Sequence, residues 1–217
     1  PNLPFQHLQI NNFLQYSLTE TIRYQINSLP THLNSYTSTE QLSYFFAAHN
    51  TNKHIQSLLK HFQSTSFYET IEHLTQQKIK RDDTLYPNDG VWKIIPDGKV
   101  SNISCYKETD KLSYTLLIFL STSHDNSQVS FKAINTKHNL CIADIPIRNN
   151  TAILYQSNKD ILASIPNVAK TDINTSIIVK HFYTCDDNSQ ITINDETINE
   201  DTPANTILQE PCRIFYL

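Results

Sequence analysis

Apolar residues recur with helical spacing in the first part of the chain and with strand spacing in the rest. Leu14, Leu18, Ile22 and Ile26 follow one another every four residues. This pattern predicts an amphipathic helix that places these four side chains on one face and ends before Pro30.

Three other segments before residue 82 carry weaker patterns. Residues 5–10 predict a short strand. Residues 55–62 and 66–74 predict two short helices, and we expect Ser66 to cap the second one. Residues 39–48 fit either a helix or a strand, and the pattern does not decide between them.

Beyond residue 82, short runs rich in β-branched and aromatic residues alternate with Asn, Asp, Ser and Pro. The predicted strands are residues 90–96, 111–120, 128–134, 140–145, 152–156, 161–165, 176–184, 190–193 and 212–217. Many short strands at this spacing are typical of a sandwich or barrel, and helices that precede them pack on one side of it. We therefore expect one α+β, mainly β, domain over residues 1–217, with helical support from residues 1–81 and a β core from residues 82–217.

Composition narrows the classes of partner. The formal net charge is -4 and the pI is about 6.1, so neither nucleic acid nor an anionic membrane surface is an expected partner. No apolar run reaches the roughly 18 residues of a membrane span, and no signal peptide is evident. The 4 cysteines lie far apart without a Cys-x-x-Cys pair, which favours reduced thiols, a cytoplasmic protein and no zinc site.

Glycine is scarce, and this excludes a class of binding loop. The chain has only 2 glycines. Phosphate-cradling loops need several glycines close together, because the backbone must approach the ligand closely. Nucleotide binding through such loops is therefore excluded.

Five segments, in order, resemble the prolyl-hydroxylase-like branch of the 2-oxoglutarate/iron(II)-dependent dioxygenases. They are residues 82–86, 90–96, 112–120, 149–155 and 175–184. The third is similar to the strand that follows the family's first metal ligands, and the last is similar to its closing strand. The resemblance implies a double-stranded β-helix (jelly-roll, cupin-like) core with supporting N-terminal helices.

The same resemblance implies where iron and 2-oxoglutarate would bind. That family holds Fe(II) with a His-x-Asp/Glu pair and a distal histidine. None of the 9 histidines here is followed two residues later by Asp or Glu. In the matching register the pair falls on Ser104 and Tyr106, with Cys105 between them, and the distal histidine falls on Ala163. These residues are poor iron ligands or lack a donor atom, so we expect no metal.

The cosubstrate position has also changed. The family clamps the 2-oxoglutarate carboxylate with an arginine two residues before a serine on the closing strand, and here Asn174 precedes Ser176. Asn cannot supply the bidentate charged grip of arginine. We therefore expect no cofactor. The residues that could line the remaining pocket are Trp92, Cys105, Tyr114 and Lys180.

The resulting hypothesis is a catalytically inactive dioxygenase-like domain that binds a protein or peptide. One alternative is an active oxygenase with atypical ligands, in which His124 or His181 takes part. Another is an unrelated jelly-roll structural or carbohydrate-binding module. We expect Lys180 to be a surface lysine, and the alternative is that it binds an acidic ligand. We expect Cys105 to be a buried, inert thiol. The sequence leaves the oligomeric state and the partner open.

Overall fold

A computed structural model of the chain describes residues 5–28, 43–47, 53–81, 89–94, 100–101, 113–121, 130–157, 160–165 and 176–185. Its elements are β1 (His7–Asn11), α1 (Tyr16–Ser28), β2 (Ser43–Ala47), α2 (Lys53–His61), α3 (Thr65–Thr75), β3 (Gly90–Ile94), β4 (Val100–Ser101), β5 (Ser113–Leu120), β6 (Ser130–Asn135), β7 (Leu140–Pro146), β8 (Thr151–Ser157), β9 (Ile161–Ile165) and β10 (Ser176–Tyr183). Mainly β architecture with helices in the first part is what the sequence predicts.

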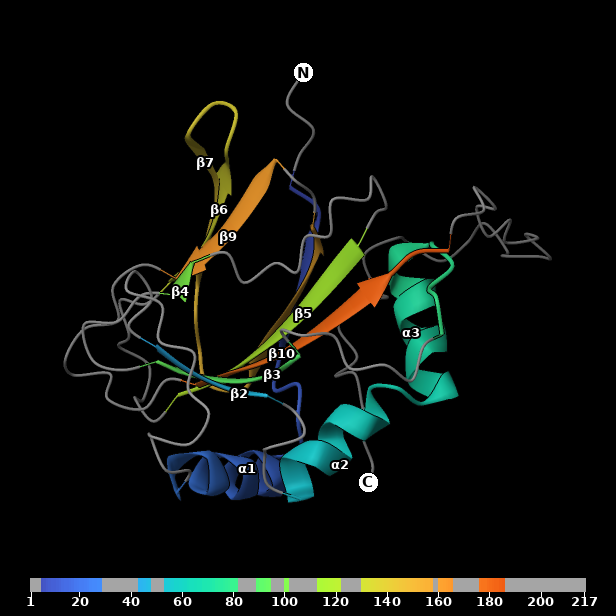
Figure 1. Cartoon of the computed structure of the whole chain (residues 1–217), viewed down its shortest axis with the longest axis vertical. Coiled ribbons are helices and arrows are strands. Elements are labelled where there is room, and N and C mark those ends of the chain that lie inside the picture. The colour runs from blue at the N-terminus through green and yellow to red at the C-terminus, as the bar shows by residue number, and fades with distance from the viewer. Residues whose placement is uncertain are drawn as a thin grey trace, which may run out of the picture.

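The described strands form two antiparallel sheets (Figure 1). The larger, with 6 strands, has the order β1-β8-β5-β10-β3-β2, and the smaller, with 4 strands, has the order β4-β9-β6-β7. From β3 to β10 the chain passes repeatedly from one sheet to the other, so that β3, β5, β8 and β10 lie together in the larger sheet. This is the double-stranded β-helix topology, and the predicted fold class is confirmed.

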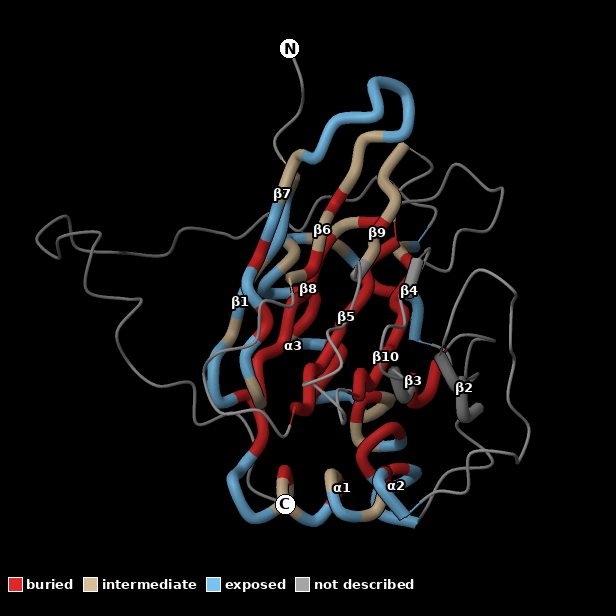
Figure 2. The backbone as a smooth tube through the Cα atoms, turned by 90° about the vertical axis from the view of Figure 1, so that its left-hand side faces the viewer, coloured by how far each residue is buried: buried red, intermediate tan, exposed pale blue. Residues whose placement is uncertain are grey.

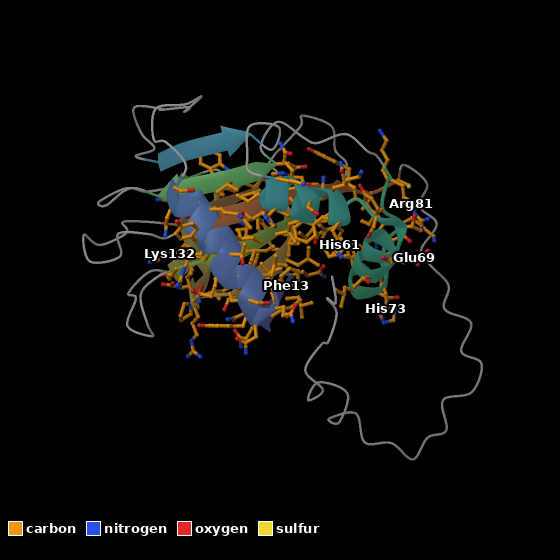
Figure 3. The ribbon with its side chains drawn as sticks, turned by 90° about the horizontal axis from the view of Figure 1, so that it is seen from below. Phe13, His61, Glu69, His73, Arg81 and Lys132 are labelled. Atoms are coloured by element: carbon orange, nitrogen blue, oxygen red, sulfur yellow. The ribbon has the colours of Figure 1, made fainter. Side chains whose placement is uncertain are left out.

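The larger sheet is covered on both faces. α1, α2 and α3 lie against one face (Figures 1 and 3), and the smaller sheet packs against the other. Every residue of β5 and β10 is buried, and both strands lie along the centre of the molecule (Figure 2). Their near-continuous apolar sequences follow from this, because a strand covered on both faces has no solvent side that needs polar residues.

Side chains that point alternately to the two faces of the larger sheet divide the core into two clusters. The helix-facing cluster includes Leu116 and Ile118 of β5 and Ile178 of β10, together with residues from all three helices. The cluster between the sheets includes Leu117 and Phe119, which are the alternate positions of β5. Successive strand residues point to opposite faces, so each of these strands contributes to both clusters.

Asn150 ties the N-terminal segment to this core. Its backbone is in the left-handed region, with φ 57°, a conformation that Asn tolerates better than most residues. The buried side chain accepts a hydrogen bond from the Leu14 backbone N–H at 2.8 Å and donates one to the Leu14 carbonyl at 2.7 Å. The turn before β8 thereby fixes the start of α1 against the sheet.

One sequence expectation needs correction, one open choice is decided, and two predicted strands are not tested. The N-cap of α3 is Ser64 and not Ser66, since the Ser64 side chain accepts the Phe67 N–H at 3.3 Å. Residues 43–47 form strand β2, which decides the open choice in residues 39–48. The strands expected at residues 190–193 and 212–217 lie outside the described residues.

Among the described residues, no helix has the length and apolar character needed to cross a membrane.

Candidate functional site

The space between the two sheets is filled by large apolar side chains in the described part of the chain. Phe119 and Tyr155 from the larger sheet meet Phe131 from the smaller one, and the rings of Phe131 and Tyr155 lie 5.3 Å apart between centroids. Phe5 adds a further ring, 5.7 Å from that of Tyr155. A closely packed aromatic interior has the character of a core, since protein interiors leave few voids as large as a water molecule.

Ala163, the position that the resemblance assigns to the distal histidine, belongs to this interior cluster. It lies on β9, opposite Ala133 of β6, and both side chains are fully buried. A methyl group offers no lone pair to a metal. Ser104, Cys105, Tyr106 and Asn174 lie outside the described residues.

The other candidate residues fall on opposite faces of the larger sheet. Trp92 on β3 is buried in the cluster between the sheets, whereas Tyr114 on β5 belongs to the helix-facing cluster. Lys180 lies between Ile178 and Phe182, which also belong to the helix-facing cluster, so alternation places it on that side. The structure therefore does not bring Tyr114 and Lys180 together with Trp92.

Lys180 is not a surface residue, and this corrects the expectation from sequence. Its side chain has 0% exposure, and so does that of its partner Asp89, which directly precedes β3. The Lys180 Nζ lies 2.6 Å from Asp89 Oδ2. A fully buried lysine is rare and is nearly always paired, as it is here.

His181 contacts the second oxygen of the same carboxylate. Its backbone N–H donates to Asp89 Oδ1 at 2.8 Å, and its ring Nδ1 lies 2.8 Å from the same oxygen. An ionised carboxylate only accepts hydrogen bonds, so Nδ1 carries a proton when Asp89 is charged. One aspartate thus binds two successive residues that point to opposite faces of β10.

The local sequence explains this arrangement. β10 pairs with β3 up to Val179 and Gly90, where β3 begins. Asp89 immediately precedes Gly90, beyond the last backbone pair between β3 and β10. Its side chain therefore accepts the hydrogen bond of the His181 backbone N–H. Lys180 and His181 are also the only residues within β10 whose side chains can carry a positive charge.

Several competing effects act on the Asp89 carboxyl. Burial by itself raises the pKa of Asp89, because the charged form loses its hydration. The hydrogen bond from His181 and the positive charges of Lys180 and His181 together outweigh burial and hold the pKa below its ordinary value. We therefore describe Asp89 as ionised inside the protein.

We call Asp89, Lys180 and His181 the Asp89 cluster, and it lies further along the chain than the position expected for the cosubstrate carboxylate. In the resemblance that position is Asn174, two residues before Ser176, at which β10 begins. Lys180 is four residues further along the strand, a distance of about 13 Å. Nothing in the sequence links Asp89 to Lys180, but a lysine followed by a histidine inside an apolar strand indicates that a buried group must pair with them.

A pair of buried hydroxyl groups lies on the strand next to this cluster. Thr115 of β5 pairs with His181 in the sheet register. The Thr115 Oγ1 lies 2.7 Å from the Ser157 Oγ of β8, and both residues are buried. The two hydroxyls satisfy each other and extend the polar region across three neighbouring strands.

A separate pocket of about 330 Å³ opens at the β1 edge of the larger sheet. Its walls come from β1, β8, the start of β5 and the end of α3, and Leu74 of α3 is 42% exposed. The lining residues are Gln6, His7, Leu8, Leu74, Thr75, Tyr114, Leu154, Tyr155 and Gln156. Its lining combines apolar side chains with two glutamine amides, and it does not include the Asp89 cluster.

The residues do not fit an iron centre of the expected type. Within the described ranges, no group of three or more His, Cys, Asp and Glu side chains is arranged to hold a metal ion. Ala163 lacks a donor atom, and Ser104 and Tyr106 are weak ligands compared with imidazole and carboxylate.

Comparison with known proteins finds similarity at the level of the fold. No family model and no curated protein matches the sequence. Among solved structures, a prolyl hydroxylase from Trichoplax adhaerens, in complex with a hypoxia inducible factor oxygen degradation domain peptide fragment, is 10% identical. Its TM-score is 0.53, over 82% of this chain and 83% of that one.

Two bacterial structures are similar to the same degree. A Pseudomonas putida prolyl-4-hydroxylase is 8% identical with a TM-score of 0.52, over 83% of this chain and 92% of that one. A 2OG-Fe(II) oxygenase family oxidoreductase from Burkholderia pseudomallei is 12% identical with a TM-score of 0.54, over 82% of this chain and 84% of that one. The chain therefore has the double-stranded β-helix fold of prolyl hydroxylases and related 2-oxoglutarate/iron(II) oxygenases.

Proposed function

We propose that this chain is a catalytically inactive member of the oxygenase fold that binds a protein or peptide. The observation that carries the proposal is the position of Ala163. In the register of the resemblance it stands where the distal histidine would stand, and it lies in an interior that is packed with Phe119, Phe131 and Tyr155. A site for Fe(II) needs polar donors and an open coordination position, and the described residues packed around Ala163 are apolar.

The decisive experiment measures cofactor binding directly. Purified protein, free of tags, is titrated by calorimetry with Mn²⁺ as a redox-inert substitute for Fe(II), and then with 2-oxoglutarate in the presence of Mn²⁺. We expect no binding of either at micromolar concentrations. One equivalent of metal with micromolar 2-oxoglutarate affinity, or turnover of 2-oxoglutarate to succinate with Fe(II), would overturn the proposal.

The partner surface that we propose is the pocket at the β1 edge. In the described part of the chain β1 ends the larger sheet, so an extended peptide could pair with it and place an apolar side chain in the pocket. Main-chain pairing would supply affinity and the pocket would supply specificity. The peptide complex of the Trichoplax adhaerens enzyme is a precedent for peptide recognition on this fold.

The chain offers a matched pair of variants for this surface. Leu74 lines the pocket and is 42% exposed, whereas Leu140, the first residue of β7, is not part of the lining and is 50% exposed. A displayed library of random peptides is selected on the unaltered protein, and the selected peptides are tested on both variants. We expect Leu74→Arg to abolish binding and Leu140→Arg to leave it unchanged. Equal binding to both variants would exclude this pocket.

The proposal includes a cytoplasmic location. Cys141 and Cys185 are both exposed and free of disulfides. Exposed free thiols persist where the compartment is reducing.

A further inference from the structure

Lys180 and Asp89 meet in the centre of the molecule as a charged pair without exposure to solvent. Both side chains have 0% exposure, and Nζ and Oδ2 are 2.6 Å apart. Taking two charges out of water is costly, and their attraction does not always repay the cost. A neutral product formed from the same two groups would remove that cost.

We infer that Lys180 and Asp89 condense to an amide, which forms an isopeptide crosslink between β10 and the residue that precedes β3. The two groups belong to neighbouring antiparallel segments of one sheet, and the folded chain holds them in contact. Oδ2 is bonded directly to the carboxyl carbon, so the nitrogen lies next to the carbon that it would attack. Such fixed contact raises the effective concentration of two reactants by many orders of magnitude.

His181 prepares the carboxyl for attack. The attack places negative charge on Oδ1, which already accepts hydrogen bonds from the His181 backbone N–H and lies 2.8 Å from the ring Nδ1. Donors that are fixed at the oxygen where charge develops stabilise the transition state without reorganisation. Oδ2 meanwhile stays beside Lys180 as the group that leaves.

The step is balanced and needs no other reactant. A proton passes from the Lys180 ammonium to Oδ2, which leaves a neutral amine beside a carboxylic acid. The amine lone pair forms the N–C bond, a second proton from nitrogen moves to Oδ2, and the C–Oδ2 bond breaks to release water. One hydrogen remains on the amide nitrogen. The ion pair and the amide both have zero net charge, so condensation removes the two charges of the pair without leaving either one buried alone.

The surroundings favour condensation over hydrolysis. The Phe182 ring lies with its centroid 5.6 Å from Lys180 Nζ, and it packs against Phe67 and Tyr68 of α3. Aromatic side chains on this face keep bulk water away from the bond once the released molecule has left. The bond would connect positions 91 apart in sequence and so enclose most of the jelly roll.

A second lysine–aspartate pair in the same chain is the internal control. Lys137 Nζ lies 2.7 Å from Asp160 Oδ2, almost the same distance, but the side chains are 61% and 32% exposed. Water solvates this pair and competes with any condensation. If burial and the donors from His181 cause the reaction, only the first pair reacts.

Mass spectrometry tests the inference on the full chain without any variant. We expect the denatured, purified protein to be lighter than its sequence by the mass of one water molecule. A protease digest should contain one branched peptide that joins Asp89 to Lys180, whereas Lys137 and Asp160 appear in ordinary peptides. A Lys180→Met variant, digested even if it folds poorly, should have the full mass of its sequence.

The opposite result is equally clear. Folded protein with the full sequence mass, in which Lys180 and Asp89 occur on separate linear peptides, would overturn the inference. A crosslink at Lys137 and Asp160 as well would show that simple proximity is enough, and it would overturn the role given to burial and His181. None of these outcomes depends on whether the protein binds a peptide or 2-oxoglutarate.

Discussion

The charged pairs of the two sheets differ in their exposure to solvent. In the larger sheet, Lys180 and His181 share the carboxylate of Asp89 without exposure to solvent. In the smaller sheet, Lys132 pairs with Asp144 on the surface, with side chains that are 35% and 53% exposed (Figure 3 labels Lys132). Both are lysine–aspartate pairs, and they differ in exposure to solvent and in the additional contact with His181. A charge inside this fold is tolerated where its partners satisfy it.

The largest expected effect comes from breaking the buried pair. Lys180→Met fills similar volume but leaves the Asp89 carboxylate without its cation, so we expect a loss of about 3–5 kcal/mol in the free energy of unfolding. Lys137→Met, in the exposed pair, should cost at most about 1 kcal/mol. Urea unfolding of both variants makes the measurement. Equal losses would show that the buried pair has no special weight, whether it is an ion pair or an amide.

The next largest effect should come from adding an ionisable side chain to the apolar cluster between the two sheets. Ala163→His restores the imidazole that the family resemblance expects, but it must enter a filled interior beside Ala133. Overpacking of this kind costs about 1–3 kcal/mol. We expect lower stability in thermal unfolding and no stabilisation when Mn²⁺ is added. Stabilisation by Mn²⁺ that is absent from the unaltered protein would show that a usable metal site survives.

A smaller effect should appear at the hydroxyl pair beside the Asp89 cluster. Thr115→Val leaves the buried Ser157 hydroxyl without its partner, which should cost about 1–2 kcal/mol. Adding Ser157→Ala removes the orphaned group, so the double variant should lose less than the sum of the two single variants. A double-mutant cycle by urea unfolding measures the coupling, and strict additivity would contradict the contact.

Local pattern predicted most elements, because apolar spacing reports directly which side of a strand or helix is covered. It placed β9 correctly at both ends and α1 to within a few residues. It missed β4, since Val100–Ser101 is too short to show any period. It could not predict the Asp89 cluster, because Asp89 and Lys180 are 91 positions apart in sequence and meet only in the folded chain. The former metal and cosubstrate positions Ser104, Tyr106 and Asn174 stay predictions.

The smallest expected effect concerns the exposed pair of Lys132 and Asp144, and it depends on pH. A hydrogen bond from the Ser130 side chain and the nearby Lys132 ammonium lower the pKa of Asp144 below 3.8, although its slight burial acts the other way. A carboxyl whose pKa is lower in the folded state adds stability above its unfolded pKa, and loses it as pH falls through the folded value. We therefore expect the contribution of Asp144 to be fully present at pH 5 and to be lost progressively as pH falls below about 4.

Solvent screening keeps this contribution small, at most about 0.5 kcal/mol, and salt should reduce it further. Asp144→Asn should remove the pH-dependent part and leave the rest of the unfolding curve unchanged between about pH 3 and 5. A difference between the two proteins that grows as pH falls would reverse the sign and contradict the assignment. Asp144 is solvated and Asp89 is not, so Asp144→Asn should change the free energy of unfolding far less than Lys180→Met does. If the two changes were similar, burial would not determine how much a charged pair contributes to stability, and the contrast between the two sheets would be lost.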